Sequence, residues 1–175
     1  MRMLTNFHLH NTKNTCIFTI LLLLLIVSGC GYYSFSGSGI PSHLKTVFIP
    51  VFEDRTAEFG ISELITESLI NEITRDNSLK IGDPRSADSM IEGVILNIRD
   101  EAGTVNVNKQ VEDIKVYVTV DVKFVDQKKR DTIWEDKLTQ WGTYEPDSID
   151  GREQGIEEAI EKLVEDIVNS IISGW

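Results

Sequence analysis

The sequence predicts an α+β fold, a two-layer sandwich with two helices packed on one face of a mainly antiparallel four-stranded sheet. Apolar and polar residues alternate strictly over residues 114–124, which is the period of a half-buried strand. Two further segments, 61–75 and about 150–171, repeat apolar residues at the three- and four-residue spacing of one helix face. Such a face must be buried against another layer, and the apolar face of the sheet is the layer available.

The first predicted strand covers residues 46–52. If it were unbroken, its faces would carry Val47, Ile49 and Val51 on one side and Phe48 and Phe52 on the other. Apolar residues on both faces indicate more burial than a one-sided strand has. Pro50 has no amide hydrogen to donate, so we expect a sheet edge or a bulge at that position.

A polar loop, 53–60, leads into the first predicted helix, which begins at Ile61 or Ser62 and ends at Arg75. Its apolar face consists of Ile61, Leu64, Ile65, Leu69 and Ile73. Residues 79–81 follow as a short strand or as a simple cover over the core, and the sequence does not decide between the two.

Three longer strands come next, over residues 90–99, 114–124 and 132–142. In the second strand Val94, Leu96 and Ile98 are expected on one face, opposite Ile91 and Ile95. In the third, the alternation predicts one face in the core and one face open to water or to a partner. Residues 126–131 form the hairpin tip that joins the third strand to the fourth.

The last predicted helix opens near residues 150–153 and carries the longest apolar stripe of the chain. The stripe consists of Ile156, Ala159, Ile160, Leu163, Val164, Ile167, Val168 and Ile171. Burying one aliphatic side chain contributes about 1.5–3 kcal/mol before entropy is counted. This helix therefore supplies a large part of the core.

The N-terminus carries the features of a bacterial lipoprotein signal. Arg2 and Lys13 precede an apolar run, 17–27, which is too short for a transmembrane helix. Val27-Ser28-Gly29-Cys30 resembles a lipobox, so residues 1–29 are predicted to be the signal peptide and Cys30 the lipidated first residue. An uncleaved buried helix and an ordinary secretory signal are the alternatives. Residues 30–44 would then be a flexible tether rich in Gly and Ser, and 45–175 a single domain.

Charge and cysteine content exclude several classes of function. The full chain has 17 Lys and Arg residues and 28 Asp and Glu residues. Removal of the signal peptide removes only Arg2 and Lys13 from these, so the remaining 15 cations and 28 anions give a net charge of −13. This balance argues against nucleic acid or an anionic membrane surface as the main partner, although it leaves room for a local basic patch within an acidic whole. Cys16 leaves with the signal peptide and a lipid would block Cys30, so we expect no disulfide, no thiolate metal site and no cofactor besides the covalent lipid.

An enzyme is not expected. The chain after residue 29 has one histidine, His43, which we interpret as a solvated loop residue. There is no phosphate-binding glycine motif and no complete Ser-His-Asp arrangement. The acid pairs Glu157/Glu161 and Glu161/Glu165 lie opposite the apolar stripe of the last helix, where a solvated face is the expected reading.

One cationic cluster is present in this acidic chain. Lys128, Lys129 and Arg130 occupy the tip between the third and fourth strands. They are candidate glycolipid-binding residues, because Arg and Lys bind phosphate groups. The competing interpretation is that charge at a turn only keeps the hairpin soluble.

The chain resembles the LptE family of lipopolysaccharide-assembly lipoproteins. The resemblance rests on Cys30-Gly31-Tyr32, on the segment 43–52 ending in Ile-Pro-Val-Phe, and on the helix opening at 60–69. The order of elements and the closing amphipathic helix also agree. The charged segment Glu53-Asp54-Arg55-Thr56 departs from the more neutral turn expected there.

The resemblance implies an outer-membrane lipoprotein facing the periplasm that plugs an LptD-type β-barrel and helps deliver lipopolysaccharide to the outer leaflet. Gly31 rather than Asp after the lipidated cysteine implies, by the same resemblance to lipoproteins, the outer membrane. The alternatives are a lipoprotein subunit of another envelope secretion or trafficking complex and, less favoured, a hydrolase that uses the acid pairs.

Overall fold

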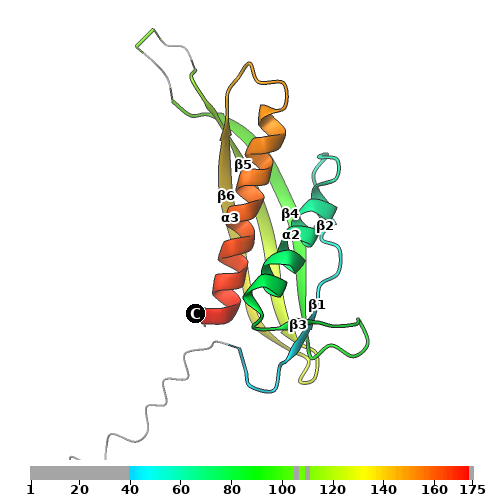
Figure 1. Ribbon diagram of the computed structural model, residues 1–175. Helices are drawn as coiled ribbons and strands as arrows, with labels where there is room; N and C mark the ends of the chain where they lie inside the picture. The colour runs from blue at the N-terminus through cyan, green and yellow to red at the C-terminus, as the bar shows by residue number, and fades with distance from the viewer. Residues whose placement is uncertain (1–39, 105–106, 109–110, 174–175) are drawn as a thin grey trace, which may run out of the picture. The chain divides into compact units, whose positions relative to one another are not determined.

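The computed structural model describes residues 40–104, 107–108 and 111–173 (Figure 1). The predicted signal peptide, Cys30 and most of the predicted tether lie outside the described residues. The described elements are β1 (Thr46–Phe48), β2 (Glu53–Asp54), α2 (Ile61–Asp76), β3 (Lys80–Ile81), β4 (Ser89–Ala102), β5 (Ile114–Asp126), β6 (Asp131–Tyr144) and α3 (Gly151–Ser173). The predicted class, α+β with two helices on one sheet, is confirmed.

The sheet is mixed and has six strands, so the prediction of a mainly antiparallel four-stranded sheet is wrong in number and direction. The strands follow the order β3-β1-β4-β5-β6, with β2 also paired to β4. β4, β5 and β6 form an antiparallel meander, whereas β1 is parallel to both β3 and β4. The parallel pairs contain only two residues each, which gives them little periodic signal in the sequence.

The first predicted strand is divided at Pro50. Pairing stops after Phe48 and resumes at Glu53, and the chain turns between the two strands. As a result, Phe52 is buried on the core side while Val51 is 63% exposed, which reverses the predicted faces of these two residues. The absence of an amide hydrogen on proline accounts for the break.

The meander follows the predicted alternation, with one register shift in the β4–β5 pairing and one in the β5–β6 pairing. Val116, Val118, Val120, Val122 and Phe124 are all fully buried. In β4 the register shifts between Ile95 and Asn97, so Leu96 is the extra residue of a bulge. Beyond the bulge Ile98 packs against the core, although the uninterrupted alternation had put it on the opposite face from Ile95.

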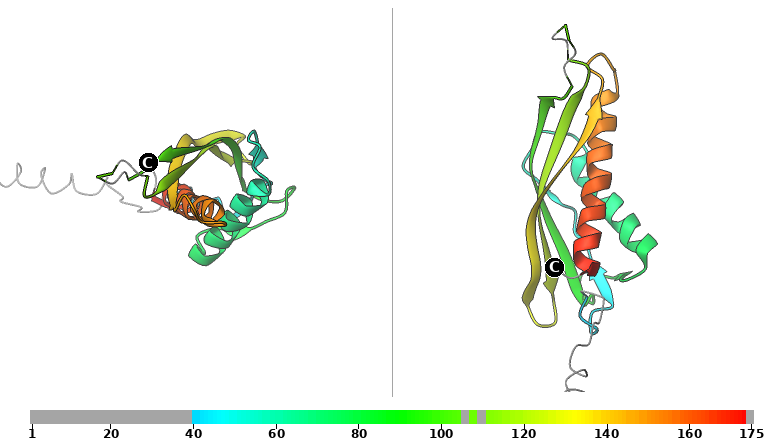
Figure 2. Two further views of the ribbon diagram at one scale, coloured as in Figure 1. Left: turned by 90° about the horizontal axis from the view of Figure 1, so that it is seen from above. Right: turned by 90° about the vertical axis from the view of Figure 1, so that its left-hand side faces the viewer.

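Both helices cover the same face of the sheet, as predicted (Figure 2). The buried side of α2 includes Ile65 and Leu69, and that of α3 includes Leu163 and Ile167, all of which join one core with the inner residues of β5. α3 comes very close to β6 at one point, where a Cβ placed on Gly142 would lie 2.0 Å from the carbonyl oxygen of Gly155. Glycine at position 142 therefore permits the contact between helix and strand.

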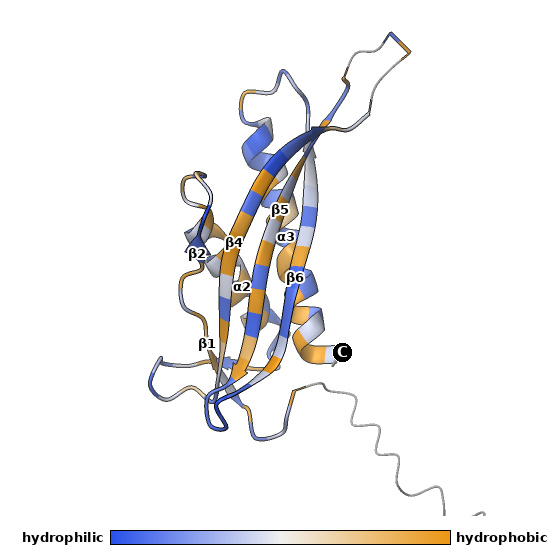
Figure 3. Ribbon diagram, turned by 180° about the vertical axis from the view of Figure 1, so that it is seen from behind, coloured by the Kyte–Doolittle hydropathy of each residue, from blue (hydrophilic) through white to orange (hydrophobic). Residues whose placement is uncertain are grey.

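The opposite face of the sheet is not covered by either helix (Figure 3). Hydrophilic and hydrophobic residues alternate along β4, β5 and β6 in this view, and in β5 and β6 the residues between the buried ones are half-buried or exposed. Within the described residues, no helix combines the length and the apolar character that crossing a membrane requires.

Candidate functional site

The β5–β6 hairpin tip is the cationic site predicted from the sequence, and its backbone is held by Asp126. The carboxylate of this residue accepts hydrogen bonds from the amides of Lys128 and Lys129 at 2.9 and 3.0 Å. Arg130 closes the turn with a left-handed φ of 57°. The tip is therefore an ordered turn whose three cationic side chains start from a fixed backbone.

Lys128 is already paired with a carboxylate of the domain. Its Nζ lies 2.6 Å from a carboxylate oxygen of Asp88, whose side chain is only 13% exposed. The other carboxylate oxygen of Asp88 accepts the amides of Lys45 and Thr46 at 2.8 and 3.1 Å. The ion pair with Lys128, followed by the Lys45 amide, holds the pKa of Asp88 far below its ordinary value.

His43 is also part of this end of the molecule, and the interpretation of it as a solvated loop residue is wrong. Its Nε2 lies 2.6 Å from Asp126, whose side chain is 3% exposed. Burial opposes ionisation of Asp126, but the hydrogen bonds from the Lys129 amide and from His43 outweigh it, so the pKa of Asp126 lies below its ordinary value. This contact was not predictable from the sequence, because 83 residues separate the two partners.

Lys129 and Arg130 are the cations that the tip leaves for an external ligand. Both side chains are exposed, and neither contacts a carboxylate among the described residues. The predicted three-cation site therefore consists of two unpaired cations and one, Lys128, that holds the hairpin to the start of β1.

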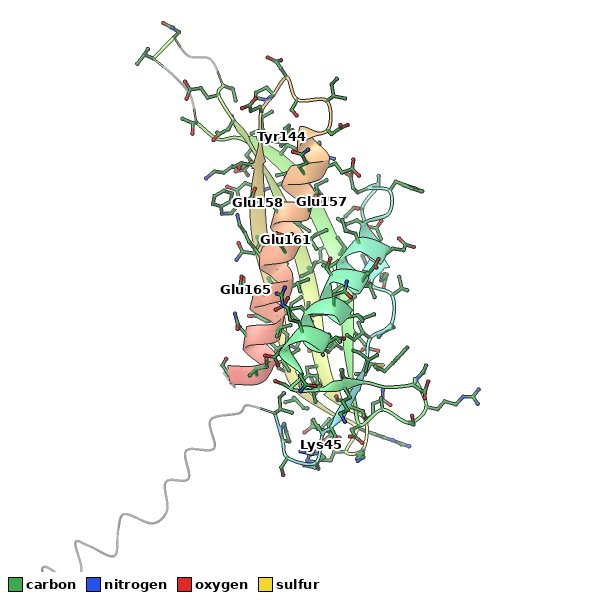
Figure 4. All side chains as sticks on the ribbon, viewed as in Figure 1. Lys45, Tyr144, Glu157, Glu158, Glu161 and Glu165 are labelled. Atoms are coloured by element: carbon green, nitrogen blue, oxygen red, sulfur yellow. The ribbon has the colours of Figure 1, made fainter. Side chains whose placement is uncertain are left out.

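The acidic face of α3 is solvent-exposed (Figure 4). Glu157, Glu161 and Glu165 lie along it and are exposed, as expected for a solvated face. No group of three or more His, Cys, Asp or Glu residues in the described part of the chain could hold a metal ion.

Glu158 and Lys162, on the same helix, turn to the edge of β6. Glu158 accepts the amide of Thr143 at 2.9 Å, and Lys162 donates to the carbonyl oxygen of Trp141 at 2.9 Å. The ion pair with Lys162, followed by the Thr143 amide, lowers the pKa of Glu158. These contacts occupy backbone groups that an added strand would need, so this part of the edge is protected against strand addition.

A group of cation–aromatic contacts, which was not predicted from the sequence, lies on the open sheet face and around the β6 edge. Lys115 and Lys162 place their Nζ atoms 4.1 and 4.3 Å from the ring of Trp141. Next to them, the guanidinium of Arg99 lies 4.6 Å from the ring of Tyr117. The alternation of β5 predicts that Tyr117 lies on the outer face of the sheet. Nothing in the sequence predicts that Lys162 lies beside Trp141.

The comparisons with known proteins agree with this fold. The model of the family LptE, lipopolysaccharide-assembly, matches residues 44–172, which confirms the resemblance seen in the sequence. A search of curated protein sequences gives no match.

Several solved structures are similar at low sequence identity. A protein from Xanthomonas campestris is 6% identical with a TM-score of 0.58, over 79% of this chain and 88% of its own. A protein from Chlamydia trachomatis is 11% identical with a TM-score of 0.56, over 73% of this chain and 95% of its own. A PelC dodecamer from Paraburkholderia phytofirmans is 14% identical with a TM-score of 0.52, over 75% and 88%. At these identities the likeness establishes the fold alone.

Proposed function

The chain belongs to the LptE family of lipopolysaccharide-assembly proteins, and from this we propose that it is a non-enzymatic outer-membrane lipoprotein that plugs an LptD-type β-barrel. In this role it assists assembly of the barrel and takes part in delivering lipopolysaccharide to the outer leaflet. The observation that carries the proposal is the family match over residues 44–172, which includes every described strand and all but the last residue of α3.

The architecture supports a plug that meets the barrel through its open sheet face. The helices bury their apolar sides against the inner face, so α2 and α3 have little apolar surface left for a partner. The outer face of the meander is rigid, because β5 pairs along its whole length with both β4 and β6. It presents exposed side chains of three long strands to a partner.

The lipid anchor remains a proposal, with Cys30 as its site. Cys30 is the only cysteine after the predicted cleavage point, and it lies outside the described residues. A thioether-linked lipid with further acyl chains would hold the protein in the membrane, since each buried methylene contributes about 0.8 kcal/mol.

The glycolipid-binding role of the hairpin tip also stays a prediction. The tip offers Lys129 and Arg130 to the phosphate groups of a lipid, whereas Lys128 is paired with Asp88. Each exposed cation contributes modestly and is screened by salt.

Isolation of the full-length lipoprotein in mild detergent tests the function. We expect a large outer-membrane β-barrel protein to co-purify with it. Recovery of a different envelope complex would support the alternative of a secretion or trafficking subunit. Substrate turnover by the pure chain would contradict the non-enzymatic assignment.

Mass spectrometry of the mature N-terminus tests the anchor separately. We expect a lipid-modified Cys30 as the first residue, and Cys30→Ala should leave an unlipidated chain at the precursor mass. An unmodified Cys30, or cleavage at another position, would contradict the assignment of the anchor.

A further inference from the structure

Three segments that are distant in the sequence meet at one end of the domain: residues 43–46, 80–88 and 126–131. β1 pairs with β3 there, Asp88 contacts both Lys45 and Lys128, and His43 contacts Asp126. Figures 1 and 4 show the hairpin tip beside Lys45, close to where the described chain begins. We call this region the entry end.

The entry end is the cationic part of an acidic protein. Its three segments hold six cations, Lys45, Lys80, Arg85, Lys128, Lys129 and Arg130, and four carboxylates, Asp83, Asp88, Asp126 and Asp131, a net charge of +2. The chain from Cys30 onward has a net charge of −13 in total, so the rest of it carries −15. An anionic surface would therefore attract this end and repel the remainder.

The hairpin tip cannot move independently of the point where the N-terminal segment joins the domain. Asp88 connects Lys128 to the amides of Lys45 and Thr46, and Asp126 connects the tip amides to His43. The amide of Gln127 adds a hydrogen bond of 2.9 Å to the carbonyl of Asp88. Lys129 and Arg130 are thus held beside the residues that continue from the predicted anchor.

The length of the connecting segment limits where the lipid can lie. Ten residue steps lead from Cys30 to Ile40, and an extended chain covers at most about 3.3–3.6 Å per residue, so the reach is at most about 33–36 Å. β5 has 13 residues and, at about 3.3 Å per residue, is about 43 Å long. The entry end is therefore the end of the domain that follows Cys30 most closely along the chain.

We propose that Lys129 and Arg130 dock on the phosphate headgroups of the phospholipid leaflet that holds the Cys30 lipid, and so orient the domain with its entry end toward that membrane surface. The inference rests on lipidation of Cys30 in the proposed function. It assigns to the tip a phospholipid surface in place of lipopolysaccharide.

The number of cations favours a tethered surface over a free ligand. Near an anionic surface each Lys or Arg contributes on the order of fivefold, so two contribute roughly 25-fold. That factor is too small to capture a dilute lipid from solution. It is sufficient to orient a domain that its own lipid already holds at the surface, where headgroups are at high effective concentration.

Fluorescence quenching in vesicles tests the orientation. The lipidated chain offers no other cysteine, so Thr132→Cys beside the tip and Ile149→Cys in the β6–α3 loop each give one labelling position. Both residues are exposed, and Ile149 is 97% exposed. Each labelled protein is reconstituted into vesicles of phosphatidylethanolamine and phosphatidylglycerol that contain a headgroup-attached quencher.

We expect strong quenching at position 132 and weak quenching at 149. Lys129→Ser with Arg130→Ser should reduce the quenching at 132 several-fold at low salt, and salt should have a similar effect on the parent protein. Lys137→Ser, an exposed cation of the same hairpin, is the matched control and should change nothing. Removing phosphatidylglycerol should weaken the quenching at 132.

Three outcomes would overturn the inference: equal quenching at the two positions, no effect of the double variant, or binding of the tip to lipopolysaccharide micelles but not to phospholipid vesicles. The last result would restore the prediction that the tip binds glycolipid. In each case the mass of the mature N-terminus and co-purification with the barrel would still decide the proposed function independently.

Discussion

β5 and β6 run for 13 and 14 residues and pair along their length, whereas β1 and β3 share only two residue pairs. The meander with α3 is held by long ladders and by an apolar stripe packed against them. The N-terminal part, β1 to β3 with α2, depends more on individual hydrogen bonds. The amide of Phe52 donates one to the hydroxyl of Thr66, and the carboxylate of Asp88 accepts two from backbone amides. The structure of the meander with α3 is therefore determined by periodic apolar burial, and that of the N-terminal part by hydrogen bonds of single side chains.

This difference predicts where substitutions will be most costly. In the meander and α3, a buried aliphatic residue is supported on several sides, so removing it leaves a cavity. In the N-terminal part, a polar residue that satisfies backbone amides has no nearby substitute.

Leu163→Ala should cost about 2–5 kcal/mol of unfolding free energy, because the side chain is fully buried at the centre of the α3 stripe. Urea denaturation measures the loss. Glu161→Ala, on the exposed side of the same helix, should change stability by less than about 0.5 kcal/mol. Equal losses for the two variants would mean that α3 does not pack on the meander as described.

Gly142→Ala should cost about 1–3 kcal/mol, because its new methyl group would meet the carbonyl oxygen of Gly155 in the α3 backbone. Gly93→Ala is the comparison in β4, where the three atoms nearest to the new methyl group all belong to the ring of Phe52, a residue of the N-terminal part. A ring can rotate away more easily than a helix backbone can shift, so Gly142→Ala should lower Tm more. A larger fall for Gly93→Ala would contradict the tight contact between α3 and β6.

Asp88→Asn should weaken the N-terminal part and alter the dependence of stability on pH. The pKa of Asp88 is lower in the folded than in the unfolded protein, so its contribution is present above its ordinary pKa of 3.8. The contribution is lost as the pH falls below that value. As the pH is lowered below about 4, the Tm of the variant should therefore fall less than the Tm of the parent protein.

Asp83→Asn is the matched control for this experiment, since Asp83 is an exposed carboxylate in the same β3–β4 connection. It should leave the slope of the acid limb as it is in the parent protein. If Asp88→Asn and Asp83→Asn gave the same pH profile, the role of Asp88 in joining the hairpin to β1 would be wrong.

Lys129→Ser with Arg130→Ser should have the smallest effect, within about 0.5 kcal/mol, because both side chains are exposed and unpaired among the described residues. Lys128→Ser should lower Tm more than the double variant, since it removes the ion pair with Asp88. Thermal unfolding of the parent and the two variants measures these changes in Tm. A larger fall in Tm for the double variant would contradict the assignment of Lys128 as the structural cation of the tip.

The same contrast explains what the sequence could predict. The alternation of β5 and the stripe of α3 predicted the core residues of the meander, and the resemblance predicted the family. The parallel pairing of β1 with β3 and β4 could not be predicted, because two-residue ladders have no period to detect. The reversal at Phe52 followed from Pro50, whose effect was expected although its geometry was not.

The sequence predicted which cations form the hairpin tip, but not which carboxylate one of them pairs with. Three consecutive cations at a turn are visible in the sequence, yet the partner of Lys128 is Asp88, 40 positions earlier, and depends on the tertiary fold. The contact of His43 with Asp126 depends on it in the same way. Long-range polar contacts of this kind leave no local signature in a single sequence.

Photo-crosslinking to the barrel tests the central proposal most directly. A photoreactive residue is placed either at Lys137, on the open face of the meander, or at Glu157, on the exposed side of α3. We expect the probe at 137 to crosslink to an LptD-type outer-membrane barrel in intact cells, and the probe at 157 to do so much less. Crosslinking to the barrel from 157 alone, or to no barrel from either position, would contradict a plug that binds through its open sheet face.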